Sequence, residues 1–73
     1  MITNDLAKWR GRHGKGGISK AHLARRVGVN YSHITRLEQG KAQPSAELMF
    51  KFADYFGCQV EDIFHYSFRG SGK

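Results

Sequence analysis

Hydrogen-bonding side chains are concentrated in one short segment near the middle of the chain. They are Tyr31, Ser32, His33, Thr35 and Arg36. Between them, Ile34 and Leu37 stand three residues apart, a spacing that puts two apolar side chains on the same face of a helix. Hydroxyl, imidazole and guanidinium groups can donate hydrogen bonds to phosphate oxygens and to base edges. The segment therefore has the chemistry to read a nucleic acid duplex, and we expect DNA.

Two short helices joined by a tight turn are predicted to support this face. The first covers residues 20–27 and the second residues 31–39, with Asn30 as the N-cap of the second. Ala24 is small, which allows the two helices to cross closely. Gly28 permits the positive φ that a tight turn requires. The pattern predicts a helix-turn-helix whose second helix presents its polar face to the outside.

Three further helices are predicted from apolar residues at helical spacing. They cover residues 5–12, about 46–56 and about 60–64. Their expected core positions are Leu6 and Trp9 in the first, and Met49, Phe52, Ala53 and Phe56 in the second. Residues 1–3 and 65–68 are predicted to be extended and can pair as a small two-stranded sheet. The glycine-rich segment 13–17 is predicted to be a flexible loop.

Length and charge limit the organisation and the partners of the chain. With 73 residues, we expect one domain at residues 1–68 and a flexible tail at 69–73. The net charge is +6, from 12 Lys and Arg against 6 Asp and Glu, which favours a polyanionic partner, nucleic acid first. Cys58 has no second cysteine to pair with, which fits the cytoplasm. No apolar run approaches the ~20 residues of a membrane span.

Catalytic and metal chemistry find no support in the residue spacing. The groups that could bind a metal are scattered at His13, His22, His33, Cys58 and His65. The glycine-rich segment lacks the spacing of a phosphate-binding loop, and no Ser, His and acid arrangement stands out. We therefore expect no enzyme activity, no catalytic residue, no metal, no cofactor and no small-molecule ligand.

Residues 19–64 resemble the Cro/C1-type helix-turn-helix regulators, also called the XRE family. The matching residues are SKAHLARRVGVNYSHITRLEQGKAQPSAELMFKFADYFG followed by VEDIF. The helix predicted at residues 5–12 also fits, through Leu6 and Arg10. The resemblance implies an all-α, five-helix fold of the lambda-repressor-like type, with its helix-turn-helix at residues 20–39. It also implies a cytoplasmic DNA-binding regulator of prokaryotic, phage or plasmid type.

The resemblance assigns roles in DNA binding to two groups of residues. The base-reading group is Tyr31, Ser32, His33 and Arg36; the group that contacts the DNA backbone is Lys20, Asn30, Thr35, Lys41 and Gln43. Arg36 is the strongest base reader because its planar fork matches guanine, with a phosphate contact as the alternative. Lys20 stands where the family usually has glutamine, and lysine holds a phosphate with less control of direction.

One ion pair is implied inside the fold. Arg10 lies on the apolar stripe of its predicted helix, where a charge without a partner is costly. In the family, the equivalent arginine pairs with a glutamate near the end of the reading helix, which here is Glu38. We expect this pair to fix the first helix to the reading helix, with two separate exposed charges as the alternative.

Aromatic residues exceed what a small core can hold, which predicts a dimer surface. The candidates are Phe50, Tyr55, Phe64, Tyr66 and Phe68. A two-fold homodimer would place two reading helices ~34 Å apart on a pseudo-palindromic operator. We expect a sequence-specific transcriptional regulator that acts as a repressor. The alternatives are an antitoxin-like or coactivator-like protein-interaction module, and a basic nucleic-acid binder without sequence preference.

Overall fold

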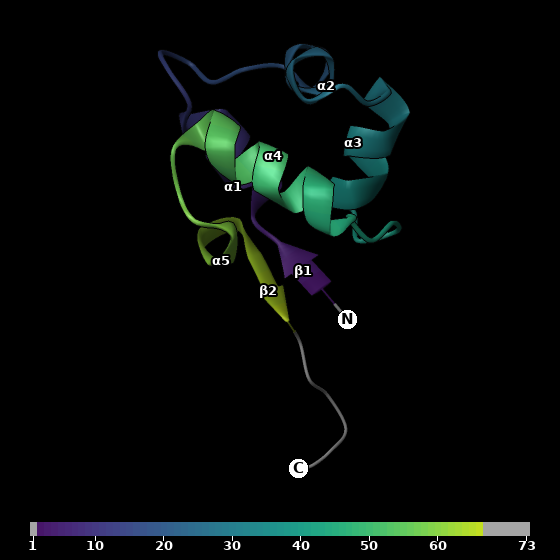
Figure 1. The fold of residues 1–73 in the computed structure, drawn as a ribbon. Coiled ribbons are helices and arrows are strands. Elements are labelled where there is room, and N and C mark those ends of the chain that lie inside the picture. Colours follow the sequence, from purple (N-terminus) through teal and green to yellow (C-terminus); the bar gives the residue numbers. More distant parts are fainter. Residues whose placement is uncertain (1, 67–73) are drawn as a thin grey trace.

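Five helices and two short strands follow one another in the computed structural model, which describes residues 2–66 (Figure 1). Their bounds are β1 Ile2–Asn4, α1 Leu6–Arg12, α2 Lys20–Val27, α3 Tyr31–Glu38, α4 Ala46–Phe56, α5 Val60–Ile63 and β2 Phe64–Tyr66. The predicted fold class, five helices with a small sheet made from the two ends of the chain, is confirmed. Within the described part, no helix is long and apolar enough to cross a membrane.

Local capping groups set where α2 and α4 begin. The Ser19 hydroxyl accepts a hydrogen bond from the backbone N–H of His22 at 3.0 Å, and Ser45 does the same for Leu48 at 3.1 Å. Each serine thereby satisfies one backbone donor that has no partner inside the helix. Gly28 ends α2 with φ 80°, a left-handed conformation that turns the chain directly into α3. The predicted helix-turn-helix is therefore formed by α2 and α3.

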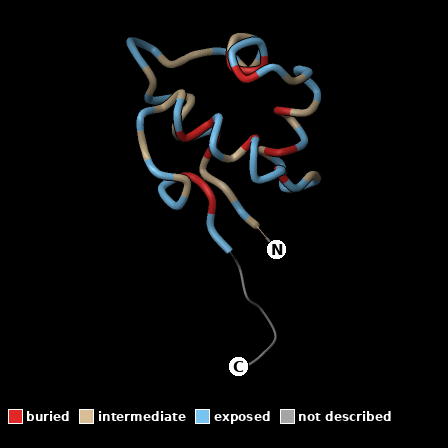
Figure 2. Tube along the Cα trace, viewed as in Figure 1, coloured by how far each residue is buried: buried red, intermediate tan, exposed pale blue. Residues whose placement is uncertain are grey.

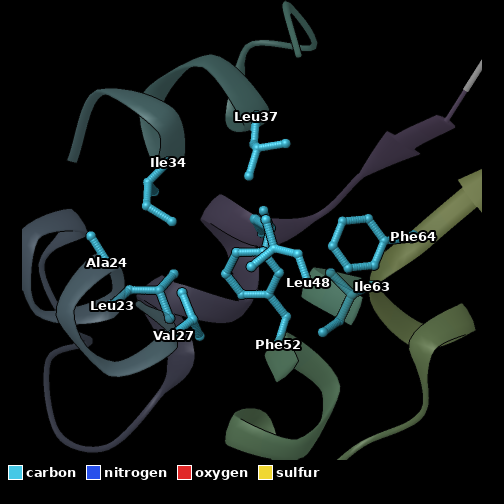
Figure 3. Close-up of a cluster of buried hydrophobic side chains, with 10 residues drawn as sticks. Leu23, Ala24, Val27, Ile34, Leu37, Leu48, Phe52, Ile63 and Phe64 are labelled. Carbon is cyan, nitrogen blue, oxygen red and sulfur yellow. The ribbon is translucent and has the colours of Figure 1, made fainter. Parts of the chain in front are cut away.

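The core lies where α2, α3 and α4 meet the end of the chain (Figure 3). Its members are Leu6, Leu23, Ala24, Val27, Ile34, Leu37, Leu48, Phe52, Ile63 and Phe64. Figure 2 shows that the buried residues lie on the inward sides of the helices, with exposed residues along the outside. Burying so many branched and aromatic side chains supplies the main stabilisation of a chain this short.

Three predicted core positions lie at the edge of the core. On α4, Leu48, Phe52 and Ala53 are buried, whereas Met49 and Phe56 are half-buried and pack against the core from outside. The helix is apolar over more than half its circumference, so spacing alone could not select the inward face. Trp9 is also half-buried, because its indole N–H donates to the carbonyl of Asp62 at 3.2 Å and so keeps the ring at the surface of the fold.

The two-stranded sheet joins the beginning of the chain to its end. β1 and β2 are antiparallel, with Thr3 opposite His65. Asn4 at the end of β1 connects the sheet to two helices: its side-chain oxygen accepts from the N–H of Leu6 at 3.0 Å, and its amide donates to the carbonyl of Leu37 at 2.7 Å. The sheet is therefore hydrogen-bonded to the C-terminal end of α3. Of the predicted strand at residues 65–68, residues 65 and 66 belong to β2, and residues 67 and 68 lie outside the described residues.

The loop between α1 and α2 is tied back onto α1. Ile18 donates its backbone N–H to the carbonyl of Arg10 at 3.0 Å. Gly17 has φ 80°, and a Cβ at this position would lie 2.9 Å from the carbonyl oxygens of Arg10 and Gly11, so only glycine fits here. The ring of His13 lies beside the Tyr55 ring, with 4.9 Å between ring centroids. These contacts attach both ends of the segment that was predicted to be a flexible loop.

Candidate nucleic-acid interface

The outer face of α3 carries the hydrogen-bonding groups that the sequence singled out. Ile34 and Leu37 are fully buried and fix the helix to the core. Tyr31 is 55% exposed, and Ser32 and Arg36 are exposed as well. His33 and Thr35 are half-buried at the sides of the helix. The helix therefore presents donors and acceptors to the outside while its two apolar anchors hold it in a fixed orientation.

A surface hollow beside the helix-turn-helix turn gathers three of the four predicted base-reading residues. It is lined by Gly28, Val29, Asn30, Ser32, His33 and Arg36. Most of its surface is polar, and it is open to solvent. Tyr31 lies outside this lining, one position before Ser32 on the first turn of α3. The hollow brings a guanidinium, a hydroxyl and an imidazole within one small surface, where all three can meet the same ligand.

Lys20 connects the start of α2 to the first turns of α3. Its ammonium group donates a long hydrogen bond of 3.5 Å to the hydroxyl of Thr35 and lies 5.8 Å from the centroid of the Tyr31 ring. A cation this close to an aromatic face is weakly attracted to it. The lysine thus places a positive charge next to Tyr31 at one side of the polar face of α3.

Two of the predicted backbone contacts remain exposed beside this face. Lys41 stands three residues after the end of α3 and is exposed. Asn30 occupies the N-cap position of α3, but its side chain makes no capping hydrogen bond, so the predicted cap is wrong for the side chain. Asn30 is exposed, so its amide is accessible to a ligand.

The amide of Gln43, which was predicted to hold a phosphate, is hydrogen-bonded within the fold. Its amide oxygen accepts from the backbone N–H of Ile2 at 2.9 Å, and its amide nitrogen donates to the carbonyl of Ile2 at 3.2 Å. The side-chain amide of Gln43 thus makes with Ile2 the same two hydrogen bonds that a peptide group of a neighbouring strand would make. Sequence spacing gave no signal for this contact, because a glutamine amide can pair with any peptide group and the partners stand 41 residues apart.

Replacing Gln43 by alanine should lower the free energy of unfolding by about 1 kcal/mol, because two partly exposed hydrogen bonds are lost. The salt dependence of DNA binding should stay that of the parent chain, since no phosphate contact is removed. Urea denaturation and a salt titration of DNA affinity measure the two effects. Lys41→Ala is the matched variant: it should leave stability nearly unchanged and reduce the salt slope by about one.

The structure brings Arg10 and Glu38 together as predicted. The Arg10 Nε lies 2.8 Å from one carboxylate oxygen of Glu38 and its Nη2 lies 3.2 Å from the other. The remaining Nη1 donates to the carbonyl of Ile18 at 3.1 Å. The side chains of Arg10 and Glu38 are 21% and 9% exposed. The hydrogen bond to Glu38 and the charge of its carboxylate raise the pKa of Arg10, so the arginine stays charged at every working pH.

The aromatic residues predicted for a dimer surface fall into four groups, of which the last, the buried Phe64, is described below. Phe50 on α4 and Tyr66 on β2 are 66% and 69% exposed. Tyr55 is half-buried and packs edge to face against Phe56, with 5.2 Å between centroids. Phe68 lies outside the described residues. The candidates that are exposed in the described part are therefore Phe50 and Tyr66.

Phe64 belongs to the core of its own chain. It is 5% exposed, and its ring lies 5.9 Å from that of Phe52. The prediction that it forms a dimer surface was wrong, because the chain enters β2 with this side chain turned inward. Its neighbour His65 is turned outward, where its ring bonds the carboxylate of Asp5 at 3.0 Å.

The arrangement of α2 and α3 around Gly28, with a buried inner face and a polar outer face on α3, defines a helix-turn-helix protein. A family model described as Helix-turn-helix matches residues 6–63. The chain belongs to this family, and its resemblance to the Cro/C1-type members is confirmed.

Similar proteins come from two archaea. An uncharacterised HTH-type transcriptional regulator of Methanocaldococcus jannaschii is 40% identical over 65 residues, which cover 89% of this chain and 94% of the relative. Two proteins of Archaeoglobus fulgidus with the same description are 42% and 44% identical over 50 residues, or 68% of this chain and 71% and 70% of theirs. The likeness therefore extends over nearly the whole length of one relative.

Proposed function

We propose that this chain is a sequence-specific, double-stranded DNA-binding transcriptional regulator that acts as a repressor. The observation that carries the proposal is the outer face of α3, where Ser32 and Arg36 are exposed directly above the buried anchors Ile34 and Leu37. The net charge of +6 supports a polyanionic ligand. The similar archaeal proteins are described as HTH-type transcriptional regulators. A bound repressor of this kind blocks polymerase at its operator in the cytoplasm.

In this proposal α3 enters the major groove, which is wide enough for a helix. Arg36 reads guanine through its two parallel donors, and Ser32 and His33 contact neighbouring base edges from the same hollow. Tyr31 lays its ring on a thymine methyl or bonds a phosphate. The positions that contact the DNA backbone are Lys20, Asn30, Thr35 and Lys41. Thr35 already accepts a hydrogen bond from Lys20, so these two act on one phosphate together.

The active form in this proposal is a homodimer on a pseudo-palindromic operator. A two-fold axis would place the two copies of α3 one helical turn of DNA apart, ~34 Å. Phe50 and Tyr66 are large exposed side chains and lie on elements other than α3, so a partner can cover them while the reading face stays open. Dimerisation doubles the length of DNA that is read and thereby raises specificity.

In vitro selection from random duplexes, followed by shift assays at two salt concentrations, tests the proposal. We expect a pseudo-palindromic site to be enriched, and its affinity to fall by ~10³–10⁵ between 50 and 200 mM salt if six to ten phosphates are neutralised. Binding without enrichment of any site would support a basic binder with no sequence preference. No binding at any salt concentration would support a protein-interaction module instead.

A further inference from the structure

An apolar groove lies between α4 and α5, and we call it the α4–α5 groove. Its walls are Phe50, Ala53, Cys58 and Val60, and its rim carries Asp54 and Glu61. Most of the groove surface is apolar. Phe50 is 66% exposed, so the described chain leaves this wall open to a ligand.

The ionisable side chains at the rim of the α4–α5 groove, Asp54 and Glu61, are acidic, although the net charge of the chain is +6. Among the described residues, Asp54 and Glu61 make no ion pair, whereas Glu38 and Glu47 pair with Arg10 and Lys51. Two such rims would repel each other if the grooves of two copies faced directly. The groove therefore suits a segment that carries an apolar side chain and positive charge.

Seven residues follow Tyr66, and their chemistry matches the groove. Their sequence is SFRGSGK, which contains one large apolar residue, Phe68, two cations, Arg69 and Lys73, and no acid. A phenyl ring can fill the apolar wall while the adjacent guanidinium reaches the carboxylates of the rim. We propose that residues 67–73 of one copy occupy the α4–α5 groove of a second copy, and that two copies exchange these segments about a two-fold axis.

The direction of β2 favours a second copy over the same chain. β2 follows α5 immediately and carries the chain away from it (Figure 1). Reversal of a chain takes about four residues in a β-turn. Only Ser67 separates Tyr66 from Phe68, which leaves fewer residues than a β-turn between β2 and the phenyl ring and so favours the groove of a second copy. The inference rests on the proposed homodimer and adds to it the segment that each copy supplies.

Disulfide formation with Cys58 tests the proposal directly, because Cys58 lines the groove and is the sole cysteine of the chain. Ser67→Cys, treated with diamide at pH above 8, should form a disulfide between two chains, seen as a dimer on a non-reducing gel. Alkaline conditions are needed because burial raises the pKa of the Cys58 thiol. A docked segment has an effective concentration of about 1 mM, so at about 10 μM protein the reaction should be roughly 100-fold faster than a random encounter.

The matched control is Ser32→Cys, which places the same new thiol on the exposed face of α3. It should cross-link to Cys58 only at the random rate. A disulfide that forms within one chain of Ser67→Cys, or a rate equal to that of the control, would overturn the proposal.

Sedimentation of variants without cysteine changes separates this inference from the proposed homodimer. Phe68→Ala should raise the dimer dissociation constant by roughly 10- to 100-fold for each of the two phenyl rings that the exchange buries. Arg69→Glu should weaken the dimer too, and Glu61→Lys in the same chain should restore part of the loss. If the parent chain is monomeric at high micromolar concentration, the homodimer itself fails. If it is dimeric and these variants equal the parent, only the exchanged segment is disproved.

Discussion

Replacing Arg36 by alanine is expected to lower the affinity for the selected operator by roughly 5- to 150-fold for each half-site, the ~1–3 kcal/mol of one bidentate base contact. Arg36 is exposed and shares its hollow with Ser32 and His33, the arrangement on which the proposed base contact rests. The preference at one base pair of each half-site should disappear with it. Repeating the selection with the variant measures both effects.

Arg25→Ala is the matched control, because it removes the same charge from an exposed position on α2, outside the hollow that Arg36 lines. It should weaken binding to all duplexes alike and leave the base preferences unchanged. If Arg36→Ala instead weakens all sequences equally and reduces the salt slope by about one, Arg36 contacts a phosphate and the base-reading role is wrong.

The parts of the fold that follow from local chemistry were predictable from the sequence. Ser19, Gly28 and Ser45 mark the ends of α2 and α4 through bonds that lie within one turn, so each can be found from nearby residues alone. Ile34 and Leu37 are the only apolar residues inside α3, so its buried face had one solution. The reading face followed directly, because every other residue of α3 is polar or carries a hydroxyl.

The predictions that failed concern burial and hydrogen-bond partners that depend on contacts between distant parts of the chain. α4 is apolar on several sides, and its contact with α2 and α5 decided that Leu48 lies inside and Phe50 outside. Phe64 and Tyr66 stand two residues apart on β2, a spacing that puts both side chains on the same face of a strand, yet Phe64 is 5% exposed and Tyr66 is 69% exposed. Strand periodicity therefore could not say that only Phe64 reaches the core. Gln43 bonds a backbone peptide group, and every residue has one. Its partner is therefore determined by where β1 lies in the fold, which the sequence around Gln43 does not indicate.

Breaking the Arg10–Glu38 ion pair is the change we expect to affect stability most. Arg10→Met keeps much of the side-chain volume but leaves the Glu38 carboxylate, with a side chain 9% exposed, without its two donors. The carbonyl of Ile18 loses a donor as well. We expect the free energy of unfolding to fall by about 2–4 kcal/mol, slightly below the range for a fully buried pair because Arg10 is 21% exposed. For a chain of 73 residues this is a large share of the total.

A double-mutant cycle with Glu38→Gln assigns this loss to the pair. If the two side chains act on each other, the double variant should recover about 1–3 kcal/mol relative to the sum of the single variants. Because Glu38 is the last residue of α3, the single variants should also loosen the reading helix and weaken operator binding at temperatures where the chain is still folded. Lys51→Met with Glu47→Gln is the matched cycle on an exposed pair, where the coupling should be below about 0.5 kcal/mol. Equal coupling in the two cycles would show that Arg10 and Glu38 do not join α1 to α3, and the position of the reading helix would then depend on core packing and on Asn4 alone.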